Sequence, residues 1–136
     1  MLANRSMPRC SVIPELGYTD IGEAIRWLGA AFAFTLRLRI ADHRAQMNVG
    51  DGAVVLTKLR EGEAARPASV MVRVDDVNSH HERAARAGAR VIQPPADFPY
   101  GERQYSAVDL AGHHWHFSQT LADVDPLDWG GTPGAL

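Results

Sequence analysis

The sequence has few of the features that mark secreted or membrane proteins. Cys10 is the only cysteine in 136 residues, so no intramolecular disulfide can form. The first ten residues lack the apolar run of a signal peptide, and with the single cysteine this predicts a cytoplasmic protein. No apolar stretch reaches the ~18 residues of a membrane span, because Arg26, Arg37 and Arg39 interrupt the most apolar region. We therefore expect no membrane partner.

The sequence also lacks an excess of positive charge. Fourteen basic and sixteen acidic residues give a formal net charge of -2, which leaves no basic surplus to neutralise a run of phosphates. Nucleic acid is therefore not an expected partner. The chain contains no G-x-S-x-G, no phosphate loop and no C-x-x-C, so these motifs give no support to nucleophilic or nucleotide-dependent chemistry.

The first half of the chain predicts a strand, a helix and three further strands. Asp20 is placed as the N-cap of the helix, and Glu23 three residues later completes a capping box. Apolar residues follow at helical spacing at Ile21, Ala24, Ile25 and Leu28. Alternating or continuous apolar runs place the strands at residues 10–16, 35–40, 45–49 and 53–58.

The same order of elements repeats in the second half. Asp76 is the expected cap of a second helix, and Gly88 stands where that helix should end. Strands are expected at 68–74, 90–92, 104–109 and 113–118. The repeat predicts an α+β protein. The chain is expected to divide into an N-terminal extension (1–9), a first βαβββ module (10–58), a linker (59–67), a second module (68–119) and a C-terminal tail (120–136). The tail has many turn formers, so we expect no helix or strand in it.

The run from Tyr100 to Phe117, YGERQYSAVDLAGHHWHF, resembles the final module of glyoxalase-like proteins of the vicinal-oxygen-chelate superfamily, whose usual form is YG-x-R-x-YS-x-x-DP-x-GH-x-W-x-F. The residues from Val12 to Asp20 resemble the matching first module. The resemblance implies the fold of glyoxalases, bleomycin-resistance proteins and dihydroxybiphenyl dioxygenases, in which two βαβββ modules form a curled mixed sheet that makes a ligand cup. Because members commonly dimerise, we expect a homodimer. The resemblance also leads us to expect a bacterial protein.

The resemblance also implies four metal-ligand positions, and this chain fills them poorly. They fall on Ile13, Val55, Ser69 and His116, of which only His116 has a side chain suited to a divalent metal. The sequence therefore predicts no metal cofactor. An alternative is a site made of His116, His114 and Glu15, since the two histidines alternate along one strand and point to the same face.

The residues expected to line the cup follow from the two-residue period of a strand. If Val70, Val72 and Val74 pack under the helix, the alternate residues of that strand face the ligand. Arg73 and Glu15 would then be buried charges that pair with each other or with a ligand. Arg103, beside a tight loop, is expected to close over an anionic ligand. The predicted ligand-binding set is Glu15, Thr57, Ser69, Met71, Arg73, Arg103, His114 and His116.

Three functions follow from these residues. The leading hypothesis is metal-independent binding of a small molecule, a drug or an aromatic metabolite, in an apolar cup with a few polar groups. The second is a lyase, isomerase or dioxygenase in which His116, His114 and Glu15 hold a divalent metal. The third is a dimeric interaction module whose cup is filled by its own side chains.

Overall fold

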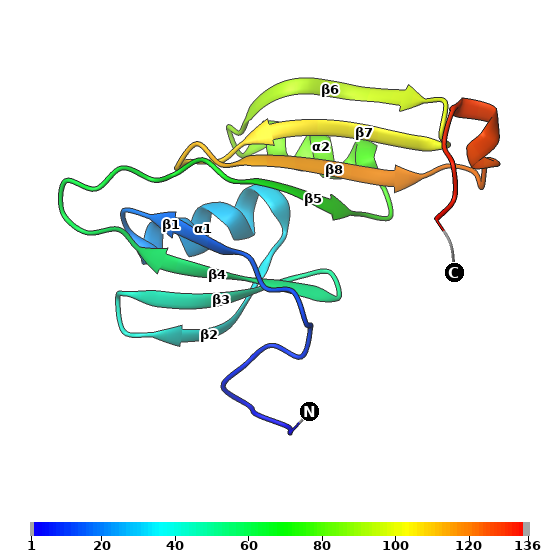
Figure 1. Ribbon diagram of the computed structural model, residues 1–136. Helices are drawn as coiled ribbons and strands as arrows, with labels where there is room; N and C mark the ends of the chain where they lie inside the picture. The colour runs from blue at the N-terminus through cyan, green and yellow to red at the C-terminus, as the bar shows by residue number, and fades with distance from the viewer. Residues whose placement is uncertain (1, 135–136) are drawn as a thin grey trace.

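The computed structural model describes residues 2–134 and contains two modules of the same element order (Figure 1). The first module comprises β1 (Glu15–Tyr18), α1 (Ile21–Phe32), β2 (Thr35–Ile40), β3 (Arg44–Val49) and β4 (Gly52–Lys58). The second comprises β5 (Ser69–Arg73), α2 (Val77–Arg86), β6 (Arg90–Phe98), β7 (Glu102–Val108) and β8 (His114–Thr120). The predicted α+β fold with two βαβββ modules is therefore confirmed.

Each module has a four-stranded mixed sheet with one helix on one face. The strand orders are β1-β4-β3-β2 and β5-β8-β7-β6, and in each the first strand runs parallel to the last. In Figure 1, α2 lies behind β7 and β8. The two helices contact each other, so the modules meet through their helical sides as well as through loops. None of the helices in residues 2–134 is long and apolar enough to cross a membrane.

Both helices begin as the sequence predicts. The Asp20 carboxylate accepts from the Glu23 backbone N–H at 2.9 Å, and the Asp76 carboxylate accepts from the Ser79 N–H at 3.1 Å. These bonds satisfy donors that a helix start leaves without partners. Helix α1 ends at Ala33, whose φ of 63° is left-handed, and the chain reverses there into β2. The apolar face of α1 is buried under the first sheet.

The clearest differences from the sequence-based expectation are at β1, at β6 and in the C-terminal tail. Strand β1 begins at Glu15 rather than Cys10, because Pro14 has no N–H to donate and only its carbonyl bonds to β4. Strand β6 continues to Phe98 through Pro94 and Pro95, which an edge strand with an irregular register accommodates. The C-terminal tail, expected to be without helix, forms a short 3-10 helix at Pro126–Trp129.

A buried turn in the second module fastens it to the first. Asp109 Oδ2 accepts from the Tyr18 hydroxyl at 2.6 Å and from Trp115 Nε1 at 3.0 Å. His113, four residues on, is also buried, and its Nδ1 accepts from the Ala68 N–H at 3.0 Å. Its Nε2 therefore carries the proton and donates to the carbonyl of Gly17 in β1 at 2.8 Å. This turn is the main polar link between the two modules near β1.

Candidate functional site

The pairing of β5 with β8 brings most of the predicted site residues together. Ser69 lies opposite His114, and Met71 lies opposite His116. These side chains, with Arg73, occupy the face of the second sheet that points away from α2, because Val70, Val72, Trp115 and Phe117 pack toward the core. We call this surface the outer face of module 2. Glu15 and Thr57 lie on the corresponding outer face of module 1.

The expected ion pair between Glu15 and Arg73 does not form. Glu15 is 3.5 Å from Arg44 of its own sheet, and both side chains are largely exposed. Arg73 belongs to the other sheet and donates to Thr120 Oγ1 at 2.7 Å. The prediction of an internal pair was wrong because it assumed that the two outer faces enclose one buried space within a single chain.

His116 is held between two serines. Its Nδ1 lies 2.6 Å from Ser106 Oγ and its Nε2 lies 3.1 Å from Ser69 Oγ, so both ring nitrogens have protein partners. Across residues 2–134, no three His, Cys, Asp or Glu side chains are grouped closely enough to hold a metal ion. The alternative site of His116, His114 and Glu15 is therefore not assembled in this conformation.

Arg103 lies on the opposite face of β7 from the residues that neighbour His116. It alternates with Gln104 and Ser106, which share the outer face, and it takes the same side as buried Tyr105. Its Nε donates to Asp97 Oδ1 at 2.7 Å, and this exposed guanidinium lowers the pKa of the Asp97 carboxyl. Arg103 is thus engaged within the sheet and does not reach toward the other predicted site residues.

The N-terminal extension covers the part of the outer face of module 1 that β2 and β3 form. Gln46 Nε2 donates to the carbonyl of Ser6 at 2.8 Å, and Arg37 donates to the carbonyl of Met7 at 2.9 Å. Gln46 and Val55 are buried although both point away from α1. Met71, on the outer face of module 2, is by contrast 64% exposed. The two outer faces are therefore not equivalent.

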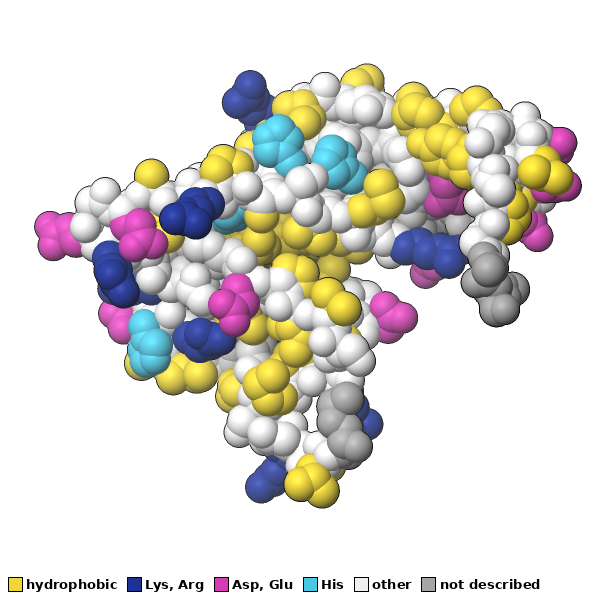
Figure 2. Space-filling model, viewed as in Figure 1, with side chains coloured by type: hydrophobic (Ala, Val, Ile, Leu, Met, Phe, Trp, Pro, Cys, Tyr) yellow, Lys and Arg dark blue, Asp and Glu magenta, His cyan; other side chains and the backbone are white. Residues whose placement is uncertain are grey.

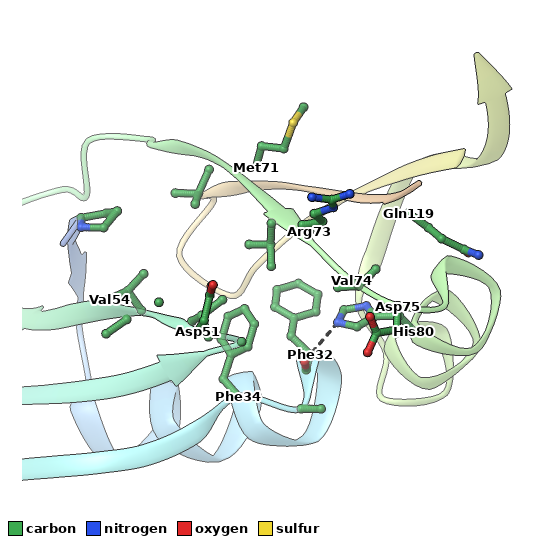
Figure 3. A pocket seen from close by; sticks show the side chains of 18 of the residues that line it. Phe32, Phe34, Asp51, Val54, Met71, Arg73, Val74, Asp75, His80 and Gln119 are labelled. Carbon is green, nitrogen blue, oxygen red and sulfur yellow. Dashed lines mark hydrogen bonds between the residues drawn. The ribbon is translucent and has the colours of Figure 1, made fainter. Parts of the chain in front are cut away.

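A cavity of about 860 Å³ lies between the two modules. Its walls come from the end of α1, the turn between β3 and β4, and the edge strand β5 (Figure 3). Figure 2 shows the hollow between the two lobes with hydrophobic side chains at its base. The apolar lining includes Phe32, Phe34, Val49, Val54, Val70, Val72 and Val74, and the polar lining includes Asp51, Arg73, Asp75, His80, Gln119 and Thr120. Of the predicted site residues, Met71 and Arg73 line this cavity.

Two phenylalanines on either side of the α1 cap are the aromatic part of the lining. The left-handed turn at Ala33 brings the Phe32 and Phe34 rings to a centroid distance of 5.6 Å. Behind them, Trp115 is 5.1 Å from Phe34, and Phe117 is 4.8 Å from Phe32. Sequence reasoning missed both phenylalanines as site residues, although Phe32 at the end of the first helix and Phe34 just after it were visible in the sequence.

His80 connects the cavity wall to the joint between the helices. Its Nε2 is 3.1 Å from the carbonyl of Phe32, so it must donate there, and Nδ1 then accepts from the Tyr105 hydroxyl. Burial lowers the pKa of His80, which keeps the ring neutral. The His80 ring packs against Phe117, with the two ring centroids 4.1 Å apart.

Comparison with known proteins places this arrangement among relatives. The chain resembles TioX from Micromonospora sp. ML1, with 35% identity, a TM-score of 0.73, and coverage of 82% of this chain and 99% of that one. It shares its fold with the bleomycin resistance determinant encoded on transposon Tn5, at 18% identity and a TM-score of 0.68 over 83% of this chain and 99% of that one.

Among curated proteins, an uncharacterized protein of Mycobacterium bovis is 34% identical over 59 residues, which is 43% of this chain. The match spans 39% of that relative, so the chain corresponds to less than half of its length. The family model described as the Glyoxalase/Bleomycin resistance protein/Dioxygenase superfamily matches residues 12–125. The chain therefore belongs to the glyoxalase/bleomycin resistance protein/dioxygenase superfamily.

Proposed function

We propose that this protein binds a small, mainly apolar molecule with an aromatic part in the cavity between its modules, without a resident metal ion. The observation that carries the proposal is the cavity itself, whose size is within the range that holds drug-sized ligands. Two phenylalanines and several valines form the apolar part of its lining, and polar side chains from α2, β5, β8 and the turn between β3 and β4 complete it. The fold shared with the Tn5 bleomycin resistance determinant supports a binding role.

Burial of apolar ligand surface supplies the affinity. A ligand that buries about 300 Å² of apolar surface gains about 7.5 kcal/mol at 25 cal/mol per Å², from which the loss of ligand freedom is subtracted. The Phe32 and Phe34 rings rest on Trp115 and Phe117, so little side-chain ordering accompanies binding. Before that loss is subtracted, the gain corresponds to a Kd of a few micromolar, which is therefore the tightest affinity that this burial alone supports.

The test is a fluorescence titration with N-phenyl-1-naphthylamine, a neutral aromatic probe that brightens in apolar surroundings. We expect saturable binding to one site per chain. Val72, half-buried on β5, faces the cavity, so Val72→Trp should fill the space and weaken binding at least tenfold. Val70→Trp is a second blocking variant in case the first does not fold.

Leu110→Trp is the matched control, because Leu110 is also a partly exposed apolar residue and does not line the cavity. Circular dichroism and thermal unfolding confirm that each variant is folded. Equal loss of probe binding in the control and in both blocking variants, or no saturable binding to the wild type, would contradict the proposed site.

The metal-independent part of the proposal has a separate test. Elemental analysis of untagged protein, purified without chelator, is expected to find far less than one metal ion per chain in the wild type and in His116→Ala. Both nitrogens of His116 are already used by Ser69 and Ser106, which supports this expectation. Near-stoichiometric metal that disappears in His116→Ala would instead favour a metal-dependent enzyme.

We also propose that the protein acts as a cytoplasmic homodimer. Apolar side chains remain exposed on two edge strands, with Leu36 at 47% and Ile92 at 43%, and exposed apolar groups of this kind are candidates for contact with a second copy. Light scattering coupled to gel filtration should give about twice the chain mass of 14.9 kDa. A mass of one chain across a concentration series would refute the dimer.

A further inference from the structure

We infer that the ligand carries an anionic group and that Arg73 binds this group at the mouth of the cavity. The inference rests on the proposed binding function and assigns a ligand class to it, an aromatic acid. Arg73 ends the edge strand β5, its side chain is exposed, and it is the single Lys or Arg among the cavity-lining residues. In Figure 3 its guanidinium lies above the phenylalanine rings.

The guanidinium of Arg73 has unused donor capacity. A guanidinium has five N–H donors, and the one recorded acceptor for Arg73 within residues 2–134 is the neutral hydroxyl of Thr120. The ion pairs in that range use Arg44, Lys58 and Arg103 instead. The bond to Thr120 holds the side chain in place without neutralising its charge. A planar carboxylate or sulfonate fits the remaining donors.

The acidic groups nearby do not neutralise Arg73 directly. Asp51 and Asp75 also line the cavity, but neither is within ion-pair distance of Arg73. Glu102 shares the outer face with Arg73, and its carboxylate accepts from Ser118 Oγ at 2.8 Å. The negative charges of Asp51 and Asp75 disfavour an anion on their parts of the rim. Among the described lining residues, Arg73 is the one Lys or Arg with which an anionic group can pair.

Two fluorescent probes with the same ring system test this assignment. The neutral N-phenyl-1-naphthylamine and the sulfonated 8-anilinonaphthalene-1-sulfonate differ by one anionic group. We expect the wild type to bind the sulfonated probe about fivefold more tightly, as a partly exposed charge contact allows. Raising the salt concentration should reduce this preference, because salt screens exposed charges.

Arg73→Gln should remove the preference for the sulfonated probe and leave the affinity for the neutral probe unchanged. Arg90→Gln is the matched control, since Arg90 is an exposed arginine on the edge strand β6 and lies outside the cavity lining. It should keep the wild-type preference. A long-range effect of net charge would instead lower the preference equally in both variants, and that result would overturn the role of Arg73.

The outcomes separate this inference from the proposed function. If neither probe binds saturably, or if Val72→Trp and Val70→Trp fold but do not weaken either probe, the binding site itself is refuted. If the neutral probe binds at the cavity but the sulfonated probe is no tighter, or Arg73→Gln does not change the ratio, the binding site stands and the anionic ligand class is refuted.

Discussion

Tyr18→Phe removes the hydroxyl that links β1 to the buried turn of the second module. The lost contact is a 2.6 Å bond from the Tyr18 hydroxyl to the Asp109 carboxylate. Burial, the charge of Asp109 and this hydrogen bond all raise the pKa of Tyr18, so the phenol stays protonated and donates at any ordinary pH. A hydrogen bond to a charged group contributes about 1.5–3 kcal/mol.

The remaining partners of Asp109 set the upper limit of the effect. Its carboxylate still accepts from Trp115 Nε1 and from the backbone N–H groups of Ala111 and His113. The charge is therefore not left without donors, and the loss should be about 2 kcal/mol rather than the 3–5 kcal/mol of an abandoned buried charge. The hydroxyl contributes little volume, so any cavity term is small.

Urea unfolding followed by circular dichroism measures this loss as a shift of the midpoint with an unchanged slope. Tyr100→Phe is the control, since its hydroxyl bonds to the neutral Gln104 amide at 3.1 Å in a partly exposed place. That variant should cost about 0.5–1 kcal/mol. If Tyr18→Phe is no more destabilising than Tyr100→Phe, the reasoning that this contact joins the modules is refuted.

Three further perturbations have defined outcomes. The pKa of His80 is lowered, so its contribution to stability is complete above the ordinary histidine pKa and declines as the pH falls toward the lowered value. The free energy of unfolding should therefore change less between about pH 7 and pH 5 in His80→Gln than in the control His81→Gln. Gly101→Ala places a methyl group against the carbonyl of Ala122 at a φ of 82°, so it should lower the free energy of unfolding in urea by at least about 2 kcal/mol. That loss should be about twice the loss in Gly112→Ala, where φ is similar but the space is open. Asp76→Ala removes the N-cap of α2 and should lower the free energy of unfolding by about 1 kcal/mol, measured in the same way.

The local signals in the sequence were sufficient for the order of elements. Asp20 and Asp76 both cap helices, because an aspartate just before a helix can accept a hydrogen bond from the backbone N–H of the third helical residue. The alternation along β5 and β8 also placed Ser69, Met71 and His116 on one face. These features depend on neighbours in sequence or on a two-residue period, which a single sequence displays.

The cavity depends on contacts that no local pattern encodes. Phe32 and Phe34 line it because the modules dock at a particular angle, which places the end of α1 against β5. The burial of Gln46 by the N-terminal extension likewise arises from residues forty positions apart in sequence. Alternation therefore identifies the two faces of each sheet, but module docking decides which face is covered and which opens onto a space.

Polar contacts on two sides of the module interface explain why the cavity persists between them. At β1, Asp109 and His113 bond to Tyr18 and Gly17. At the end of α1, Arg83 donates to the carbonyls of Gly29 and Ala30, both at 3.0 Å. Because these contacts fix the relative position of the modules, apolar walls face each other across a space that side chains do not fill. A ligand that enters meets walls already in place, so the ordering that opposes binding is small.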